Sequence, residues 1–283
     1  MAPEPQQALA WGDALGRHGL PVFAGALLVL AVLCGLAFRS TRGRLHVDAN
    51  PDAPPAAARL IAVFGIGFAA LLAVGALAFA AIARRISDQS WLVRFDHALS
   101  DAIGVQTPAL ALQFFSVATH LGDPLVLAVL CIAGAAWLWR VGRRTMALAW
   151  VLAIGGNAIL NKSLKHVFER ARPPYESLPW HAEGYSFPSG HTSGSVVAYG
   201  MVAYLALRLL PPRWQVPVAT AAVLAIFTTA CSRVFLQVHF ASDVLAGATS
   251  GGLWLAICIA GAEASRHYRR HRRRRREAQL GES

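Results

Sequence analysis

The sequence predicts an all-α membrane protein, a polytopic bundle of helices that crosses the bilayer several times. Of its 283 residues, 55% are hydrophobic and only 14% are charged, and the mean hydropathy is +0.46. A soluble domain needs a more polar surface than this composition provides. The apolar residues also form long segments that are nearly free of charge, which is typical of membrane-spanning helices.

Seven segments are apolar over a length that suits the hydrocarbon core of a bilayer. They are residues 20–38, 60–83, 124–139, 145–160, 191–210, 214–230 and 244–262. The third and fourth are short, and the third could begin near Ala109 with a bend at Gly122 and Pro124. We therefore expect seven spans, with loose boundaries for the third and fourth.

The charges around these segments predict their orientation. Acidic residues outnumber basic ones before the first segment, whereas Arg39, Arg42 and Arg44 follow it, which favours an uncleaved anchor whose N-terminus lies outside. If the spans then cross the membrane in alternating directions, most basic residues lie on the cytoplasmic side, and Arg84 and Arg85 are among the exceptions. Because the composition is rich in alanine and arginine, we expect a bacterial inner membrane protein. The loops after the even-numbered spans would face the periplasm.

The net charge of +11 does not indicate a nucleic-acid partner. Only two of the 26 basic residues are lysines, and the arginines lie mostly between or after apolar segments, as orientation signals do. The cysteines have no CxxC spacing and no nearby histidine pair, so we expect neither a disulfide framework nor a structural metal site. They are Cys34, Cys131, Cys231 and Cys258.

Three stretches lie outside the spans. Between residues 88 and 122, apolar residues recur at helical spacing opposite polar ones, which predicts an amphipathic helix along the outer membrane face. The apolar residues are Trp91, Leu92, Phe95, Leu99 and Ile103, and the polar ones are Arg94, Asp96, Ser100 and Asp101. Residues 50–58, with three prolines, read as a linker, and the arginine-rich segment 266–276 is expected to be a disordered cytoplasmic tail.

Three polar blocks fall at span ends on the same, outer face of the membrane. The first runs from Lys165 to Pro173 and closes the fourth span. The second is Pro-Ser-Gly-His at residues 188–191, where the fifth span opens. The third runs from Ser232 to Asp243, between the sixth and seventh spans. This shared face predicts that the three blocks form one site.

The cations in these blocks predict a phosphate site. Arg172 and Arg233 offer paired donors that match phosphate oxygens, and Lys165 adds a compact point charge. Ser189 and Gly190 lie where a helix begins, so their backbone N–H groups and the helix dipole would favour the same anion. Any one of these basic residues taken singly could be a membrane-interface anchor, but the set together indicates an anion.

Two histidines complete the requirements of phosphoryl transfer. His239 is the candidate nucleophile, because Asp243 follows it at i+4 and can hold one ring nitrogen while the other presents its lone pair. His191 is then the candidate general acid and base. We expect no metal ion and no other cofactor, since the three cations supply the charge that magnesium would otherwise supply.

The three blocks together resemble the signature of the type 2 phosphatidic acid phosphatase superfamily. That signature is a lysine followed after six residues by Arg-Pro, then Pro-Ser-Gly-His, then Ser-Arg with a histidine after five further residues and an aspartate after three more. All eleven specified residues are present in order. The resemblance covers about residues 107–262. It leaves the first two spans and the tail outside.

The resemblance implies a six-helix catalytic core, so the chain would carry one extra N-terminal span. It also implies a phosphohistidine intermediate on His239, oriented by Asp243, with His191 protonating the leaving oxygen and no metal cofactor. The residues implied to hold the phosphate are Lys165, Arg172, Ser189, Gly190 and Arg233. We accordingly expect an N-terminal membrane region at 1–106, a catalytic membrane domain at 107–262 and an arginine-rich tail at 263–283.

The function expected from these residues is hydrolysis of a membrane lipid phosphate or diphosphate, such as undecaprenyl diphosphate, phosphatidic acid or phosphatidylglycerophosphate. A lipid phosphotransferase would use the same residues, so the sequence does not separate transfer from hydrolysis. A non-enzymatic transporter is disfavoured, because the span centres are nearly free of charge. The expected partners are the lipid substrate and membrane lipids, and the sequence indicates no oligomeric state.

Overall fold

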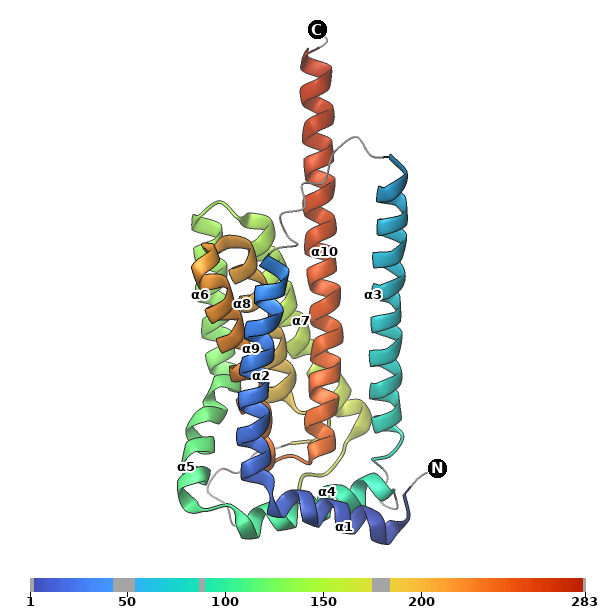
Figure 1. The fold of residues 1–283 in the computed structure, drawn as a ribbon, viewed down its shortest axis with the longest axis vertical. Coiled ribbons are helices and arrows are strands. Elements are labelled where there is room, and N and C mark those ends of the chain that lie inside the picture. Colours follow the sequence, from blue (N-terminus) through green and yellow to red (C-terminus); the bar gives the residue numbers. More distant parts are fainter. Residues whose placement is uncertain (1–2, 43–53, 87–89, 175–183, 282–283) are drawn as a thin grey trace.

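The computed structural model describes residues 3–42, 54–86, 90–174 and 184–281, and this part of the chain is helical almost throughout (Figure 1). It contains ten α-helices, one 3₁₀ helix (η1) and no strand. The elements in order are α1 Pro5–Arg17, α2 Gly19–Arg42, α3 Pro54–Ala83, α4 Trp91–Gln106, α5 Ala109–Ala118, η1 Thr119–Gly122, α6 Pro124–Arg140, α7 Arg144–Phe168, α8 Gly190–Leu209, α9 Pro212–Phe235 and α10 Ala241–Gly281.

The long helices form the membrane bundle. Figure 1 shows α2, α3 and α5 to α10 along the long axis of the molecule, whereas α1 and α4 lie across one end. Each predicted span lies within one of these helices, apart from the last residue of 191–210. Among the described residues, four segments are apolar enough to cross a bilayer by themselves, namely Gly19–Leu36, Arg144–Phe168, Pro212–Phe235 and Ala241–Arg266. The all-α fold with several apolar spans is confirmed.

The third span begins earlier than its apolar core. Helix α5 starts at Ala109, turns into η1, and is followed at Pro124 by α6, which is the earlier start that the sequence allowed. The chain bends by 117° between α4 and the segment Ala109–Gly122. Proline suits the first position of α6, because the N–H that it lacks would have no partner within the helix there. Asp123, the residue before it, therefore lies at the break between η1 and α6.

Close packing between α8 and α10 depends on glycine. A Cβ on Gly247 would lie 2.6 Å from the Ser189 carbonyl oxygen, and one on Gly251 would lie 2.8 Å from that of Ser193. The two glycines are four residues apart and share one face of α10, so the backbones can approach as small residues allow in membrane bundles. This contact holds the start of α8 against the start of α10.

Two features differ from expectation at the ends of the bundle. Helix α1 was not predicted, and it packs closely on α4. The contact needs glycine, because a Cβ on Gly12 would lie 2.6 Å from Phe95 O and one on Gly16 would lie 2.5 Å from Ala102 Cβ. The tail expected to be disordered is instead a continuation of α10 to Gly281, which extends beyond the bundle in Figure 1. Arginine, glutamate, glutamine and alanine are good helix formers, and a preceding span removes the cost of nucleation.

The expected amphipathic helix exists as α4, but its assigned polar face is wrong in part. Asp96 and Ser100 are buried, whereas periodicity had placed them opposite the apolar side. Asp96 accepts hydrogen bonds from Ser242, and the carbonyl of Ser100 accepts one from the Gln237 side chain at 2.7 Å. The start of α10 and the loop before it therefore cover Asp96 and Ser100, whereas Arg94 and Asp101 are exposed as expected. Of the linker expected at residues 50–58, residues 54–58 instead form the start of α3, and residues 50–53 lie outside the described residues.

Candidate active site

The three polar blocks meet at the end of the bundle that α1 and α4 cross. Helix α7 ends at Phe168, because Glu169 takes a left-handed conformation (φ 44°), and the chain then enters the loop that carries Arg172. Ser189 caps the start of α8. The short loop between α9 and α10 carries His239. Tertiary contact thus brings together residues that lie up to about 70 positions apart in sequence.

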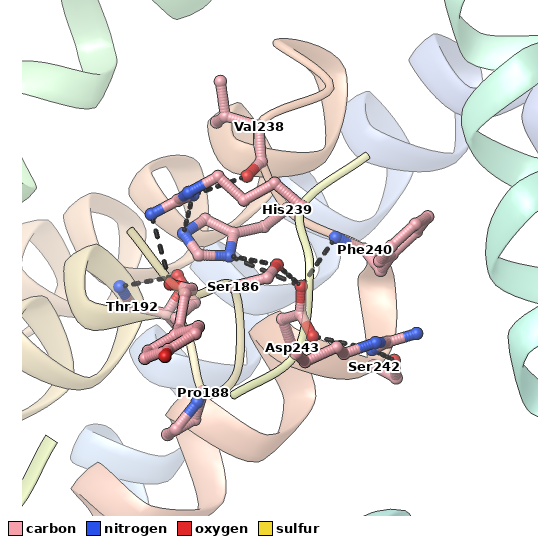
Figure 2. A network of polar contacts seen from close by, with 12 residues as sticks. Ser186, Pro188, Thr192, Val238, His239, Phe240, Ser242 and Asp243 are labelled. Carbon is pink, nitrogen blue, oxygen red and sulfur yellow. Dashed lines mark hydrogen bonds and ion pairs between the residues drawn. The ribbon is translucent and has the colours of Figure 1, made fainter. Parts of the chain in front are cut away.

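The ring of His239 is held from both sides. Its Nδ1 lies 3.4 Å from Asp243 Oδ2 and 3.3 Å from Ser186 Oγ, as Figure 2 shows. Its Nε2 lies 3.1 Å from Arg172 Nη1. A guanidinium can only donate, so Nε2 must accept and the ring proton belongs on Nδ1, toward Asp243. The arrangement leaves Nε2 as the nitrogen with a lone pair.

Burial keeps His239 uncharged. The side chain is fully enclosed, and this burial lowers its pKa to about 3, with the nearby cations Arg172 and Arg233 adding to the shift and Asp243 opposing it. At neutral pH the imidazole is therefore uncharged, as a nucleophile requires, and its Nε2 lone pair would be free to attack once Arg172 donates to a phosphate instead.

Asp243 is fixed by several donors at once. Its Oδ1 accepts from Arg170 Nη1 at 2.7 Å, and its Oδ2 accepts from the backbone N–H of Phe240 at 3.0 Å and from the hydroxyl of Ser186. These contacts, drawn in Figure 2, hold the carboxylate in one orientation behind His239. Asp243 therefore lies beside Nδ1 of His239, and its role in orienting a nucleophile stays a prediction.

Sequence reasoning missed Arg170 and Asp96. The Arg170 guanidinium lies between two buried carboxylates, since its Nη2 donates to Asp96 Oδ2 at 3.0 Å while Nη1 donates to Asp243. Asp96 also accepts from the backbone and the hydroxyl of Ser242. A signal for Arg170 was present, because it lies two positions before Arg172 in the first block. Asp96 offered none, since it precedes that block by some seventy residues on another helix.

The three predicted cations line one cavity. Lys165 donates to the carbonyl of Tyr185, and Arg172 donates to the carbonyls of Gly184 at 2.9 Å and Val238 at 2.7 Å. Arg233 is 5% exposed; its Nη1 donates to Thr119 Oγ1 at 2.6 Å, but its Nε has no hydrogen-bond partner among the described residues. A buried donor without a partner costs free energy that a phosphate oxygen would recover.

His191 has a partner that the sequence did not assign to it. Its Nε2 lies 2.8 Å from Asp123 Oδ1, at the break between η1 and α6. The other oxygen of Asp123 lies 2.5 Å from Nδ1 of the exposed His120. The sequence had left this acidic residue without a catalytic part, since nothing local connects it to a histidine 68 positions away.

Ser189 and Gly190 differ in what they offer a ligand. Ser189 is fully buried as the N-cap of α8, and its N–H donates to the carbonyl of Asp243 at 3.0 Å. That N–H is occupied, so the contact shown for Ser189 is structural and its part in phosphate binding stays a prediction. Gly190 lines the cavity, where a Cβ would lie 3.0 Å from Asn161 Oδ1.

The cavity has a volume of about 820 Å³ and two chemically different parts. Its polar end contains the predicted Lys165, Arg172, Gly190, His191, Arg233 and His239. Its other part runs between α6 and α7 and is lined by Leu127, Ala128, Cys131, Ile132, Ile154 and Ala158. Such a shape suits a molecule with an anionic head and a long apolar chain. No group of three or more His, Cys, Asp or Glu suited to a metal ion occurs in the described part of the chain.

Comparisons with known proteins agree with this architecture. The PAP2 superfamily matches residues 144–266. Phosphatidylglycerophosphatase B of Bacillus subtilis (strain 168) is 35% identical over 146 residues, which cover 50% of this chain and 70% of that protein. Lipid A 1-phosphatase of Rhizobium etli (strain CFN 42) is 29% identical over 178 residues, or 55% of this chain and 72% of that protein.

A solved structure extends the similarity to the fold. The transmembrane PAP2-type phosphatidylglycerolphosphate phosphatase from Bacillus subtilis superposes with a TM-score of 0.61 at 28% identity, covering 70% of this chain and 96% of that one. The aligned part is larger than the segment from Lys165 to Asp243 that carries the three blocks. Helices outside this segment therefore also align with helices of the Bacillus subtilis structure. The chain therefore belongs to the PAP2 superfamily, as a membrane-embedded phosphatase.

Proposed function

We propose that the protein hydrolyses a lipid phosphate or diphosphate through a phosphohistidine intermediate on His239, without a metal ion. The observation that carries this proposal is the pair of contacts on the His239 ring. Asp243 faces Nδ1, and the cation Arg172 faces Nε2 where a phosphate would enter. A neutral, oriented imidazole beside permanent cations is the combination that nucleophilic phosphoryl transfer needs.

In the first step, Nε2 of His239 attacks phosphorus and the bond from phosphorus to the leaving lipid oxygen breaks. The cations Lys165, Arg172 and Arg233 neutralise the charge on the phosphoryl oxygens. His191 donates a proton to the leaving oxygen. Because Asp123 holds Nε2 of His191, the proton would pass through Nδ1.

In the second step, water attacks the phosphohistidine and the P–N bond breaks. His191 now takes a proton from the water, so one residue acts first as acid and then as base. Inorganic phosphate leaves, and His239 returns to its neutral form. Asp243 stabilises the charge that appears on the ring in the intermediate and holds the tautomer between the two steps.

The candidate substrates are undecaprenyl diphosphate, phosphatidic acid and phosphatidylglycerophosphate. The names of the relatives support a lipid phosphate, and the apolar part of the cavity supports a chain-bearing substrate. The test is to offer the purified protein these three lipids and to measure free phosphate alongside phosphate transferred to added alcohols. Phosphate release that is lost in His239→Ala is expected. If more phosphate were transferred to the alcohols than released as free phosphate, the protein would be a phosphotransferase and the proposed hydrolysis would be wrong.

We further propose that the site faces the periplasm from a bacterial inner membrane, with residues 107–262 as the catalytic membrane domain. The arginine bias supports this orientation. The region 1–106 takes part as well, because Asp96 on α4 contacts Arg170. Single cysteines at Gln106, the exposed last residue of α4 at the site end of the bundle, and at Ser283 test the orientation in a chain without the four native cysteines. An impermeant maleimide should label only Gln106→Cys in intact cells, and labelling of Ser283→Cys would refute it.

A further inference from the structure

Helix α7 carries a second lysine on the wall of the same cavity. Lys162 lies one helical turn before Lys165, and both line the cavity with His191. Its side chain is exposed, and it has no hydrogen bond or ion pair with any residue that the structure describes. A cation inside a membrane-spanning helix is costly and is usually matched by an anion.

The direction of α7 places Lys162 deeper in the bundle than Lys165. The helix runs from Arg144 to Phe168, and the phosphate end of the cavity lies at its C-terminal end. Residues three apart are neighbours on one helix face, separated by about 4.5 Å along the axis. Lys162 therefore lies about one helical turn further from the phosphate end of the cavity than Lys165 does.

Beyond Lys162 most of the cavity lining is apolar, and the two polar residues of α7 there, Asn157 and Asn161, donate hydrogen bonds to Ser193 Oγ at 3.4 and 3.1 Å. Ala158 and Ile154, one and two turns deeper on α7, line this part of the cavity together with Cys131 and Leu127 of α6. Lys162 thus stands at the border between the phosphate end and the apolar part. A lipid with its terminal phosphate at His239 and its chain along α6 and α7 would place the group that links them beside Lys162.

We infer that Lys162 binds a second anionic group of the substrate, the one that connects the reacting phosphate to the lipid. This inference rests on the proposed function and makes lipids with two anionic phosphorus groups the preferred substrates. In a lipid diphosphate the group is the inner phosphate, which leaves with the lipid when the bond to the outer phosphorus breaks. In a simple lipid monophosphate the same place holds uncharged atoms, so Lys162 has no partner there.

The experiment compares a diphosphate with a monophosphate of identical chain. Farnesyl phosphate and farnesyl diphosphate are offered to the wild type, Lys162→Met and Lys162→Arg, and kcat/KM is measured for each. Methionine keeps the length of the side chain and removes its charge. The control is Arg85→Met, which removes a cation near the same end of the bundle. Among the described residues, its guanidinium donates only to the carbonyl of Ala81 at the end of α3, at 3.0 Å.

For Lys162→Met we expect kcat/KM on the diphosphate to fall by about tenfold to a hundredfold, the usual range for losing a hydrogen bond to a charged group. Turnover of the monophosphate should be unchanged, Lys162→Arg should retain the diphosphate preference, and Arg85→Met should behave as the wild type.

Two results would overturn the inference while leaving the proposed function intact. One is an equal loss on both substrates in Lys162→Met, which would make Lys162 an interfacial anchor. The other is a wild type that hydrolyses only the monophosphate. If the wild type released phosphate from neither lipid nor from the phospholipid panel, the proposed function itself would fail, so the two failures are separable.

Discussion

Arg170 donates a hydrogen bond to Asp243 over 2.7 Å, and both side chains are buried. The second nitrogen of the same guanidinium donates to Asp96 on α4 over 3.0 Å. Asp243 in turn faces His239. Helix α4, which lies outside the matched family segment, is therefore connected through the side chains of Arg170 and Asp243 to His239, the proposed nucleophile. This chain of contacts predicts that Arg170 is a positioning residue for His239.

The first prediction concerns Arg170→Lys. An ammonium keeps the charge but cannot donate in fixed directions to two carboxylates, so Asp243 should lose its orientation. We expect kcat to fall by about tenfold to a hundredfold, on the scale of losing one well-placed donor, while KM changes little. Steady-state kinetics on one lipid phosphate measures both.

The control for this variant is Arg208→Lys, at an arginine that pairs with Glu263 at 2.7 Å near the surface and far from the site. It should be kinetically normal. If Arg170→Lys lowers the melting temperature but the folded enzyme keeps its kcat, Arg170 is structural only and the positioning role is wrong.

The second prediction concerns Asp123→Asn. Without the carboxylate, Nε2 of His191 loses its charged partner at 2.8 Å, and the proton on the ring is no longer directed. Phosphatidic acid, whose alcohol leaves poorly, should be turned over about tenfold to a hundredfold more slowly, part of what a general acid contributes. An aryl phosphate needs no proton on its leaving group and should be affected much less.

Asp13→Asn supplies the comparison, because Asp13 also pairs with a basic side chain, Arg17, but at the surface of α1. It should leave both substrates unaffected. Equal losses on the alkyl and the aryl substrate in Asp123→Asn would show that Asp123 does not act through the proton on His191.

The third prediction concerns Arg233→Lys. The Arg233 Nε is buried without a partner in the described part of the chain, and lysine would remove that donor while keeping the charge. We expect kcat/KM to fall by about a hundredfold, as for other losses of a transition-state donor. Arg213→Lys, at an exposed arginine at the start of α9, should be normal. Near-normal kinetics in Arg233→Lys would mean that Arg233 does not bind the phosphate and serves only in packing, through its contact with Thr119.

Asp96 and Arg170 also show where prediction from sequence ends. The spans were predictable because each helix in a bilayer must satisfy its own backbone, so apolar length alone locates it. The meeting of the three blocks was predictable because span ends on one face lie close together. The burial of Asp96 was not predictable. Helical periodicity assigns a polar residue to the solvent side, whereas here Ser242 at the start of α10, 146 positions later, covers it.

The contact between Asp123 and His191 could not be predicted from the sequence for a similar reason. It lies at the break before Pro124, where the sequence suggested only a bend. Its contact with His191 depends on the packing of η1 against α8, and no local pattern reports packing between distant helices. The same holds for Ser186, which contacts both His239 and Asp243 from the loop before α8.

The measurement that tests the central claim most directly is rapid-quench detection of the phosphoenzyme in His239→Ala and His191→Ala, with phosphatidic acid and with a lipid diphosphate. We expect no acid-labile phosphoenzyme in His239→Ala with either substrate, because the covalent bond forms at its Nε2. In His191→Ala, formation should be slowed strongly for phosphatidic acid and less for the diphosphate, whose leaving group is already a stable anion. A phosphoenzyme that persists in His239→Ala would contradict the account.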